Sequence, residues 1–331
     1  MEQLSNDHSK LSIGVDLGGT RITTVLANSQ GRVIHQLDAP TPVKDGAKEI
    51  VKTIESEITT LLSREPTEIQ ELLGIGIACP GAVDIHRQII TTCPNLPGFN
   101  YFPLADNLSE RFRTKIRIGN DLTLAGVGEH RFGAGKGVSH MIFLGIGTGI
   151  GGGIILDNKV YNGVSGSAGE IGHIVTHPNG PKCGCGNRGC LEAIASGNSL
   201  VKLARKRVEA GENSILNKLF SQSSKWTDSV NKLSSESIFE GALAGDLLSK
   251  SIITNGSIAL GTGLATLVNL FNPQIIVIGG GLASQWGLYI EPAIGEMNRL
   301  ALPQPKQDVK IVPSSLTGLA AALGAITLLE D

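Results

Sequence analysis

Three cysteines and a histidine lie close together in one glycine-rich stretch, "GHIVTHPNGPKCGCGNRGC". His173, Cys183, Cys185 and Cys190 fall within eighteen residues. Three thiolates and one imidazole suit a tetrahedral Zn²⁺, and four protein ligands leave no open position for a catalytic water, so the predicted metal is structural. A redox pair would require C-x-x-C at the start of a helix, which this spacing does not provide. Isolated thiols remain the alternative.

Two carboxylates flank this stretch. Glu170 precedes His173 by three residues, and Glu192 follows Cys190 by two. Carboxylates and an imidazole that face one cavity match the hydroxyls of a sugar, because each buried hydroxyl left unpaired costs about 1 to 3 kcal/mol. His173 can bind zinc through one ring nitrogen and a sugar hydroxyl through the other, which would couple the metal to the substrate. His177 is expected to be an ordinary loop histidine.

Glycine-rich turns in other parts of the chain suggest contacts with phosphate. In "GVDLGGT", Asp16 ends a short β-rich run, where its carboxylate can hold Mg²⁺ while the Thr20 hydroxyl and the loop amides contact phosphate. For this loop alone, Gly18 and Gly19 favour a plain hairpin turn over a phosphate contact. The second glycine-rich turn, "LGIGTGIGGG", and a third run, "VIGGGL", favour phosphate binding.

Two familiar nucleotide motifs do not fit. Gly147, Gly149 and Gly152 match G-x-G-x-x-G, but that motif must open a helix, and the β-rich "IILDNKVYNG" follows instead. "GAGKG" lacks both the Ser/Thr and the upstream glycine of a P-loop.

"IGND" places Asn120 and Asp121 between an expected strand and the helix-like "LTLAGVGEH". Phosphoryl transfer to a hydroxyl needs a carboxylate within hydrogen-bond reach, which makes Asp121 the candidate base. Either residue can instead cap the helix. The dipeptide alone does not decide between these roles.

The expected elements support these sites. "LSIGVD" with "RITTVLAN", and "HMIFLGI" with "IILDNKVYNG", form two similar hairpins around glycine turns, which indicates a duplicated architecture. Apolar spacing predicts a helix over 47–64 and a core helix, not a membrane span, over 257–271. "PQIIVIGGG" predicts a strand, and 199–256 is helical and amphipathic without a motif.

The length of 331 residues favours two domains, or one domain with a large insertion. We expect an N-terminal small α/β domain over 1–118 and a larger α/β domain with the zinc-binding loop over 119–314. The last segment, 315–331, is expected to return and pack on the first domain.

Composition limits the function classes. A chain with 41% hydrophobic and 18% charged residues is typical of a soluble globular protein. The polar first ten residues predict a cytoplasmic address, and a net charge of −2 gives no electrostatic footprint for nucleic acid. The expected partners are small molecules, with no membrane. Cys79 and Cys93 are predicted to be buried, inert thiols.

These glycine turns together resemble the sugar-kinase, Hsp70 and actin superfamily, and "E-x-G-H" followed by "C-x-C-G-x-x-G-C-x-E" resembles the ROK family signature. The resemblance implies an α/β fold of two ribonuclease-H-like domains, with ATP and sugar in the cleft between them. Arg21, where relatives often carry Lys or Asn, is expected to keep a positive charge near phosphate. Phe99 stands where a Trp is common.

The resemblance also implies roles for particular residues. Those expected to contact ATP and Mg²⁺ are Asp16, Gly18, Gly19, Thr20, Arg21, Gly147, Thr148, Gly149, Gly279, Gly280 and Gly281. Those expected to contact the hexose are Gly81, Asn120, Asp121, Glu170, His173 and Glu192. Asp121 is the implied base, and a structural Zn²⁺ is expected on His173 and the three cysteines.

The predicted function is therefore ATP-dependent phosphorylation of a hexose at its 6-hydroxyl, with glucose preferred. An N-acylmannosamine or other amino-sugar kinase is the alternative. A sugar-sensing regulator of the same family is a remote one, because about fifteen residues precede Asp16, too few for a DNA-binding domain. The family resemblance also implies a homodimer or homotetramer.

Overall fold

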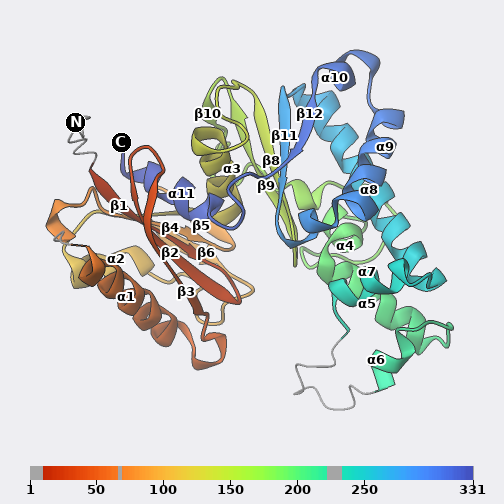
Figure 1. Cartoon of the computed structure of the whole chain (residues 1–331), viewed down its shortest axis with the longest axis horizontal. Coiled ribbons are helices and arrows are strands. Elements are labelled where there is room, and N and C mark those ends of the chain that lie inside the picture. The colour runs from red at the N-terminus through yellow and green to blue at the C-terminus, as the bar shows by residue number, and fades with distance from the viewer. Residues whose placement is uncertain (1–9, 66–68, 222–232, 331) are drawn as a thin grey trace, which may run out of the picture. The chain divides into compact units, whose positions relative to one another are not determined.

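The computed structural model describes residues 10–65, 69–221 and 233–330, a mixed α/β structure built on two five-stranded sheets (Figure 1). It separates into two compact units. The first unit comprises Met1–Phe143, Gly153–Gly169 and Ser314–Asp331, and the second comprises Leu144–Gly152 and Glu170–Pro313. The domain boundary expected near residue 118 stays a prediction.

The first sheet has the strand order β3-β2-β1-β4-β7. Its strands are β1 Leu11–Leu17, β2 Arg21–Asn28, β3 Val33–Pro40, β4 Ile75–Cys79 and β7 Ile116–Asn120. The strands β1, β2 and β3 are joined antiparallel, as expected for the first hairpin, and β4 and β7 then extend the sheet in parallel beyond β1.

The second sheet repeats this plan in the order β10-β9-β8-β11-β12. Its strands are β8 Met141–Ile146, β9 Ile150–Leu156, β10 Lys159–Val160, β11 Ile275–Gly279 and β12 Lys310–Pro313. The same succession in both sheets confirms the predicted duplication. The glycine turn is shorter than expected, because Gly151–Gly153 belong to β9. A Cβ at Gly153 would lie 3.0 Å from the Thr123 carbonyl oxygen, so close backbone packing explains a glycine inside this strand.

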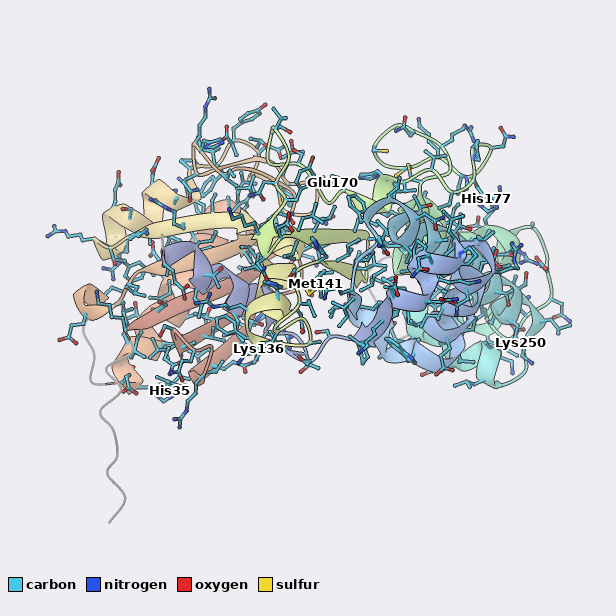
Figure 2. The ribbon with its side chains drawn as sticks, turned by 90° about the horizontal axis from the view of Figure 1, so that it is seen from above. His35, Lys136, Met141, Glu170, His177 and Lys250 are labelled. Atoms are coloured by element: carbon cyan, nitrogen blue, oxygen red, sulfur yellow. The ribbon has the colours of Figure 1, made fainter. Side chains whose placement is uncertain are left out.

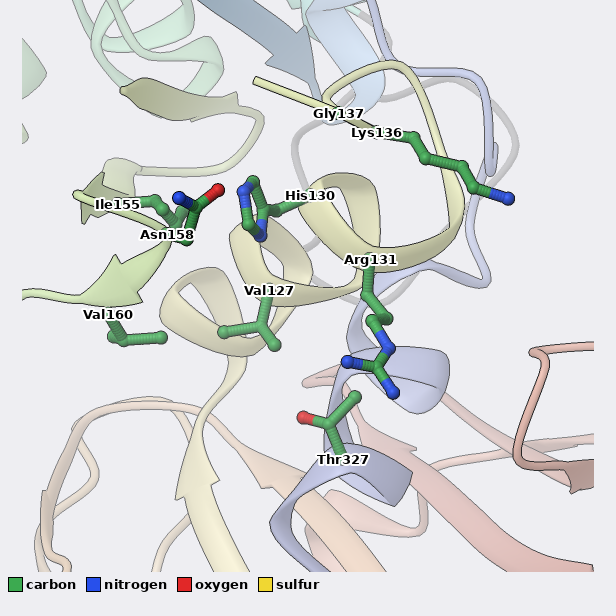
Figure 3. A pocket seen from close by; sticks show the side chains of 9 residues that line it. All are labelled: Val127, His130, Arg131, Lys136, Gly137, Ile155, Asn158, Val160 and Thr327. Carbon is green, nitrogen blue, oxygen red and sulfur yellow. The ribbon is translucent and has the colours of Figure 1, made fainter. Parts of the chain in front are cut away.

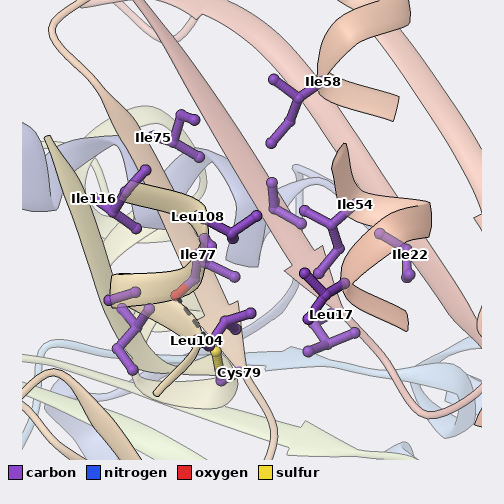
Figure 4. Close-up of a cluster of buried hydrophobic side chains, with 14 of the residues drawn as sticks. Leu17, Ile22, Ile54, Ile58, Ile75, Ile77, Cys79, Leu104, Leu108 and Ile116 are labelled. Carbon is purple, nitrogen blue, oxygen red and sulfur yellow. Dashed lines mark hydrogen bonds between the residues drawn. The ribbon is translucent and has the colours of Figure 1, made fainter. Parts of the chain in front are cut away.

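Helices α1 (Ala47–Arg64) and α2 (Leu104–Phe112) pack on one face of the first sheet. The range of α1 confirms the predicted helix, and its buried residues Ile50, Ile54, Ile58 and Leu61 recur every three or four positions. Figure 4 shows Ile54 and Ile58 among the buried side chains of the sheet. Each such burial stabilises the fold by about 1.5 to 3 kcal/mol.

Helix α11 (Ala320–Ile326) packs on β1, β2 and β4 and against α3 (Asp121–Phe132). It contacts Val25 and Ala27 of β2, which alternate along the strand with the residues facing α1. A Cβ at Gly14 in β1 or at Gly76 in β4 would lie 2.1 or 2.0 Å from a carbonyl oxygen of α11. These two glycines therefore let the helix backbone rest directly on the sheet.

The remaining helices lie in the second unit. They are α4 Leu191–Ala195, α5 Gly197–Glu209, α6 Asn217–Ser221, α7 Ser235–Leu243, α8 Leu247–Phe271, α9 Glu291–Leu300 and α10 Pro303–Asp308. They confirm the helical character expected of 199–256, although 222–232 lies outside the described residues.

Helix α8 is longer than the predicted 257–271. It is long and apolar enough to cross a membrane by length and composition alone, but 67% of its most apolar window is buried inside the structure. Ser257 of α8 donates to the Tyr289 carbonyl oxygen at 3.0 Å. These contacts are those of a core helix.

Candidate active site

Two predicted site carboxylates lie at one edge of the first sheet. Because β1, β4 and β7 run parallel, their carboxyl ends meet there. Asp16 is the next-to-last residue of β1, and Asp121 directly follows β7. Burial, and then the charge of Asp121, raise the pKa of Asp16 to about 7. A site that crowds two carboxylates in this way is suited to a cation.

The turn between β1 and β2 holds the first predicted phosphate loop. The Gly18 N–H donates to the Arg21 carbonyl oxygen at 3.0 Å, and a Cβ at Gly18 would lie 2.7 Å from that oxygen. Thr41 secures the loop twice, through its hydroxyl to the Gly18 carbonyl at 2.7 Å and its N–H to the Thr20 carbonyl at 3.0 Å. Thr41 lies outside the motif and was not among the predicted site residues.

Arg21 forms an ion pair with Asp38 of β3, with Nε and Oδ1 3.5 Å apart. Its side chain is 59% exposed. The guanidinium is thus held by a neighbouring strand while remaining open to solvent, and its contact with phosphate stays a prediction.

Asn120 is the N-cap of α3. Its Oδ1 accepts from the Thr123 N–H at 2.9 Å, while its Nδ2 donates to the Gly81 carbonyl at 2.9 Å. Gly81 has φ +88°, and a Cβ there would lie 2.1 Å from the Thr92 carbonyl oxygen. Of Asn120 and Asp121, the two candidates for the helix cap, Asn120 is the residue that caps α3. Asp121 is the first residue of the helix proper, and its Oδ1 accepts from the Leu122 N–H at 2.8 Å.

In the second unit, the turn between β8 and β9 holds Gly147, Thr148 and Gly149. Its carbonyls accept from the start of α5, with Gly197 N–H to the Gly147 oxygen at 2.8 Å. Glu192 Oε2 accepts from the Ile150 N–H at 2.9 Å, and a Cβ at Gly149 would lie 2.5 Å from that oxygen. The carboxylate predicted to contact sugar therefore also supports the predicted phosphate turn.

The turn after β11 lies beside this hairpin. Gly280 has φ +85°, and a Cβ there would lie 2.4 Å from the Ile146 carbonyl oxygen at the end of β8. The amide of Gly281 is 3.8 Å from the Cβ position of Gly147. The structure thus brings two of the predicted nucleotide loops together.

His173, Cys183, Cys185 and Cys190 form one cluster, with all four ligand atoms within 4.8 Å of one another. Cys183 Sγ is 3.7 Å from His173 Nδ1, and Cys185 Sγ is 3.7 Å from Cys190 Sγ. Ligands about 2.1 to 2.3 Å from a tetrahedral zinc would be about 3.6 to 3.8 Å apart, so the residues fit that metal. Burial, followed by the neighbouring thiols, raises the pKa of Cys190 to about 12, an effect that a bound cation would oppose.

The cluster lies beside the predicted sugar residues. His173 turns Nδ1 to the cysteines and places Nε2 3.8 Å from Glu170 Oε2. The backbone of Gly172 lies against Glu192, because a Cβ at Gly172 would be 3.3 Å from the Glu192 Cβ. His177, labelled with Glu170 in Figure 2, uses its carbonyl to accept from the Gly180 N–H at 2.8 Å.

Each unit therefore brings together its own part of the predicted site. The first unit holds Asp16, Gly18, Gly19, Thr20, Arg21, Gly81, Asn120 and Asp121. The second holds the three residues of the β8–β9 turn, Glu170, Glu192, the cluster and Gly279–Gly281. Glu129, a fully buried residue of α3 in the first unit, was also not among the predicted site residues.

Two α/β sheets of the same strand order, each with glycine turns at its hairpin, define the fold class of the sugar kinases, actin and hexokinase. The ROK family model matches residues 12–331. The chain belongs to the ROK family.

Individual relatives are similar over nearly the whole chain. A glucokinase of Thermotoga maritima is 32% identical over 319 residues, covering 96% of this chain and 97% of the relative. A putative xylose repressor of Caldicellulosiruptor is also 32% identical, but the chain covers 79% of it. The crystal structure of a ROK family glucokinase from Streptomyces griseus in complex with glucose and AMPPNP is 33% identical, with a TM-score of 0.78, covering 96% of this chain and 98% of that one.

Proposed function

We propose that this chain is an ATP-dependent hexokinase that phosphorylates the 6-hydroxyl of glucose. The observation that carries the proposal is the placement of Asp16 and Asp121 at one sheet edge, where the charge of Asp121 contributes to the raised pKa of Asp16. The glucokinase of Thermotoga maritima and the glucose complex of the Streptomyces griseus enzyme support glucose as the substrate.

In the proposed reaction, Asp121 accepts the proton of the sugar 6-hydroxyl, and the oxygen of that hydroxyl attacks the γ-phosphorus of ATP. The bond between that phosphorus and the β–γ bridging oxygen breaks, and ADP leaves with the bridging oxygen. Asn120 positions Asp121, since it caps α3 from one side and bonds the Gly81 carbonyl from the other. The loop amides of Gly18–Thr20 and of the β8–β9 turn would contact the phosphates.

Asp16 would hold Mg²⁺, which screens the phosphate charge when bound. Glu170, His173 and Glu192 would accept and donate hydrogen bonds to the sugar hydroxyls. The cluster of His173 and the cysteines would hold one structural Zn²⁺. This metal would keep Glu170, His173 and Glu192 in position to bind the sugar. The Tyr289 hydroxyl, which donates to the carbonyl of Ala195 at the C-terminal end of α4 at 2.6 Å, stabilises the same region.

The test is an ADP-release assay with Mg-ATP across glucose, mannose, fructose, N-acetylglucosamine and N-acetylmannosamine. Strong turnover on glucose supports the proposal. Preference for an acylated sugar would support the amino-sugar alternative, and no turnover on any hexose would contradict both.

A sugar-responsive regulator is a second candidate. It is favoured because the chain is as similar in sequence to the putative xylose repressor as to the Thermotoga maritima glucokinase, at 32% identity each. Retention of specific DNA, combined with absent turnover, would support it.

We further propose that the chain is cytoplasmic and forms a homo-oligomer. The oligomer is favoured because large apolar side chains such as Leu243, Leu247 and Leu270 are about 70 to 80% exposed in the single chain. Light scattering over a range of concentrations measures its mass.

A further inference from the structure

A cavity of about 410 Å³ opens in the first unit at the C-terminal end of α3, and none of the roles above uses it. It is bounded by α3, the loop after it, β9, β10 and the C-terminal turn Thr327–Leu329 (Figure 3). Its volume falls in the range of small-molecule sites, about 300 to 1,000 Å³.

One wall of the cavity is apolar, formed by Val127, Ile155 and Val160. Beside it, His130 and Asn158 face one another in Figure 3. His130 Nε2 donates to the Val138 carbonyl oxygen at 2.8 Å, so in the neutral ring Nδ1 is an acceptor. The cavity thus offers an apolar surface next to groups that bind a hydroxyl or an N–H.

The charged group of the cavity is Arg131. Its guanidinium points toward Thr327 in Figure 3 and contacts the Glu330 carboxylate, with Nη2 and Oε2 3.0 Å apart. The Arg131 side chain remains 55% exposed. The Lys136 side chain points away from the other lining side chains in Figure 3, so its charge is directed away from them. Arg131 therefore already binds a carboxylate supplied by the chain itself.

We propose that this cavity binds a small organic anion. Its apolar body would lie on Val127, Ile155 and Val160, and its carboxylate or phosphate would replace Glu330 on Arg131. A planar guanidinium recognises both kinds of anion. Glu330 acts as an internal competitor that the ligand displaces.

One element of the cavity, α3, leads to the proposed catalytic residue Asp121. Helix α3 carries Val127 and Arg131 near one end and Asp121 at the other. It packs backbone to backbone on α11, since a Cβ at Gly128 would lie 2.1 Å from the Ala320 carbonyl oxygen. A ligand bound between α3 and Thr327 thus contacts one helix of a tightly packed pair. Its binding changes the rate of the proposed reaction, in which Asp121 is the base. This second part rests on the proposed hexokinase activity, whereas binding does not.

The binding test uses phenylacetate and phenyl phosphate as anionic probes, with neutral 2-phenylethanol for comparison, titrated onto the purified full chain by calorimetry and ligand-observed NMR. We expect an anionic probe to bind at least tenfold more tightly than 2-phenylethanol. Arg131→Gln should weaken anion binding at least tenfold, and Glu330→Gln should strengthen it severalfold because the competitor is gone. Arg111→Gln, outside the cavity, should leave it unchanged.

Absence of anion binding up to about 10 mM, or equal affinity in Arg131→Gln, would overturn the site. The opposite signs expected for Arg131→Gln and Glu330→Gln separate ligand recognition from a general loss of stability. For the second part, a saturating anionic probe should change the glucose KM or kcat of the parent enzyme by at least twofold and leave Arg131→Gln unaffected. Unchanged kinetics at proven occupancy would overturn the coupling, while a chain that binds the probe but lacks hexokinase activity would count against the proposed function alone.

Discussion

The Glu192 carboxylate accepts a hydrogen bond from the Ile150 backbone N–H at 2.9 Å. Ile150 is the first residue of β9, directly after the glycine turn, and Glu192 is the second residue of α4, two positions after the cluster residue Cys190. One side chain therefore joins the proposed phosphate turn, sugar site and metal loop of the second unit.

Replacing Glu192 should affect both substrates. In Glu192→Ala the Ile150 N–H loses its acceptor and the sugar loses a partner, so the KM for glucose should rise about 10- to 100-fold and the KM for ATP by a smaller factor. Glu192→Gln keeps an oxygen for Ile150 and should spare the KM for ATP. Steady-state kinetics measure both, with the exposed Glu209→Gln as the control. An unchanged KM for ATP in Glu192→Ala would separate Glu192 from the phosphate turn.

Removing the proposed zinc should weaken sugar binding. Cys185→Ser leaves three ligands, so metal content should fall well below one per chain, and the KM for glucose should rise because His173 and Cys190 no longer fix Glu170 and Glu192. Elemental analysis and kinetics measure the two effects. Cys93→Ala, a buried cysteine outside the cluster, should retain the metal. Full zinc and full activity in Cys185→Ser would remove the structural role.

The raised pKa of Asp16 predicts that this residue costs stability when substrates are absent. The carboxylate is disfavoured in the folded chain, so its cost is absent below its ordinary pKa of 3.8, grows as the pH rises, and is complete above about 7. Asp16→Asn should therefore be more stable than the parent at pH 8 by roughly 1 to 3 kcal/mol, and equal near pH 4, while losing activity. Urea unfolding at both pH values measures this, with exposed Asp106→Asn for comparison. A variant less stable than the parent at pH 8 would contradict it.

Sequence patterns predicted the elements whose signals are local. The apolar spacing of 47–64 located α1, and glycine between two β-rich runs located both hairpins. The spacing of His173, Cys183, Cys185 and Cys190 predicted a cluster that the structure forms. Each of these depends on residues within about twenty positions of one another.

Features that depend on distant contacts were not predictable in this way. Thr41 is brought to Gly18 by the β2–β3 hairpin, and no motif marks it. The first ten residues of α8 are less uniformly apolar than the rest, so the pattern located only its C-terminal part.

Glu129, by contrast, did give a signal in the sequence. It falls on the buried stripe of α3 with Leu124, Ala125 and Gly128, where a carboxyl group needs hydrogen-bond partners.

Glu129 should be important for stability. Its carboxyl oxygens accept from the Ser314 hydroxyl, the Ser315 hydroxyl, the Leu316 N–H and the Ala134 N–H. Glu129→Gln would turn one oxygen into a donor that faces other donors, so the free energy of unfolding should fall by about 1 to 3 kcal/mol. Thermal and urea unfolding measure the loss, against exposed Glu110→Gln. No loss in Glu129→Gln would show that these hydrogen bonds contribute little.

The most direct test of the proposed function compares the parent chain with Asp121→Asn in a glucose-dependent ADP-release assay, with glucose binding measured separately by calorimetry. If Asp121 is the base of a hexokinase, the parent should turn over glucose, and the variant should lose roughly 10²- to 10⁴-fold in kcat while its affinity for glucose changes much less. Asp106→Asn should match the parent. An unchanged kcat in Asp121→Asn would reduce Asp121 to a residue at a helix start and contradict the proposed mechanism.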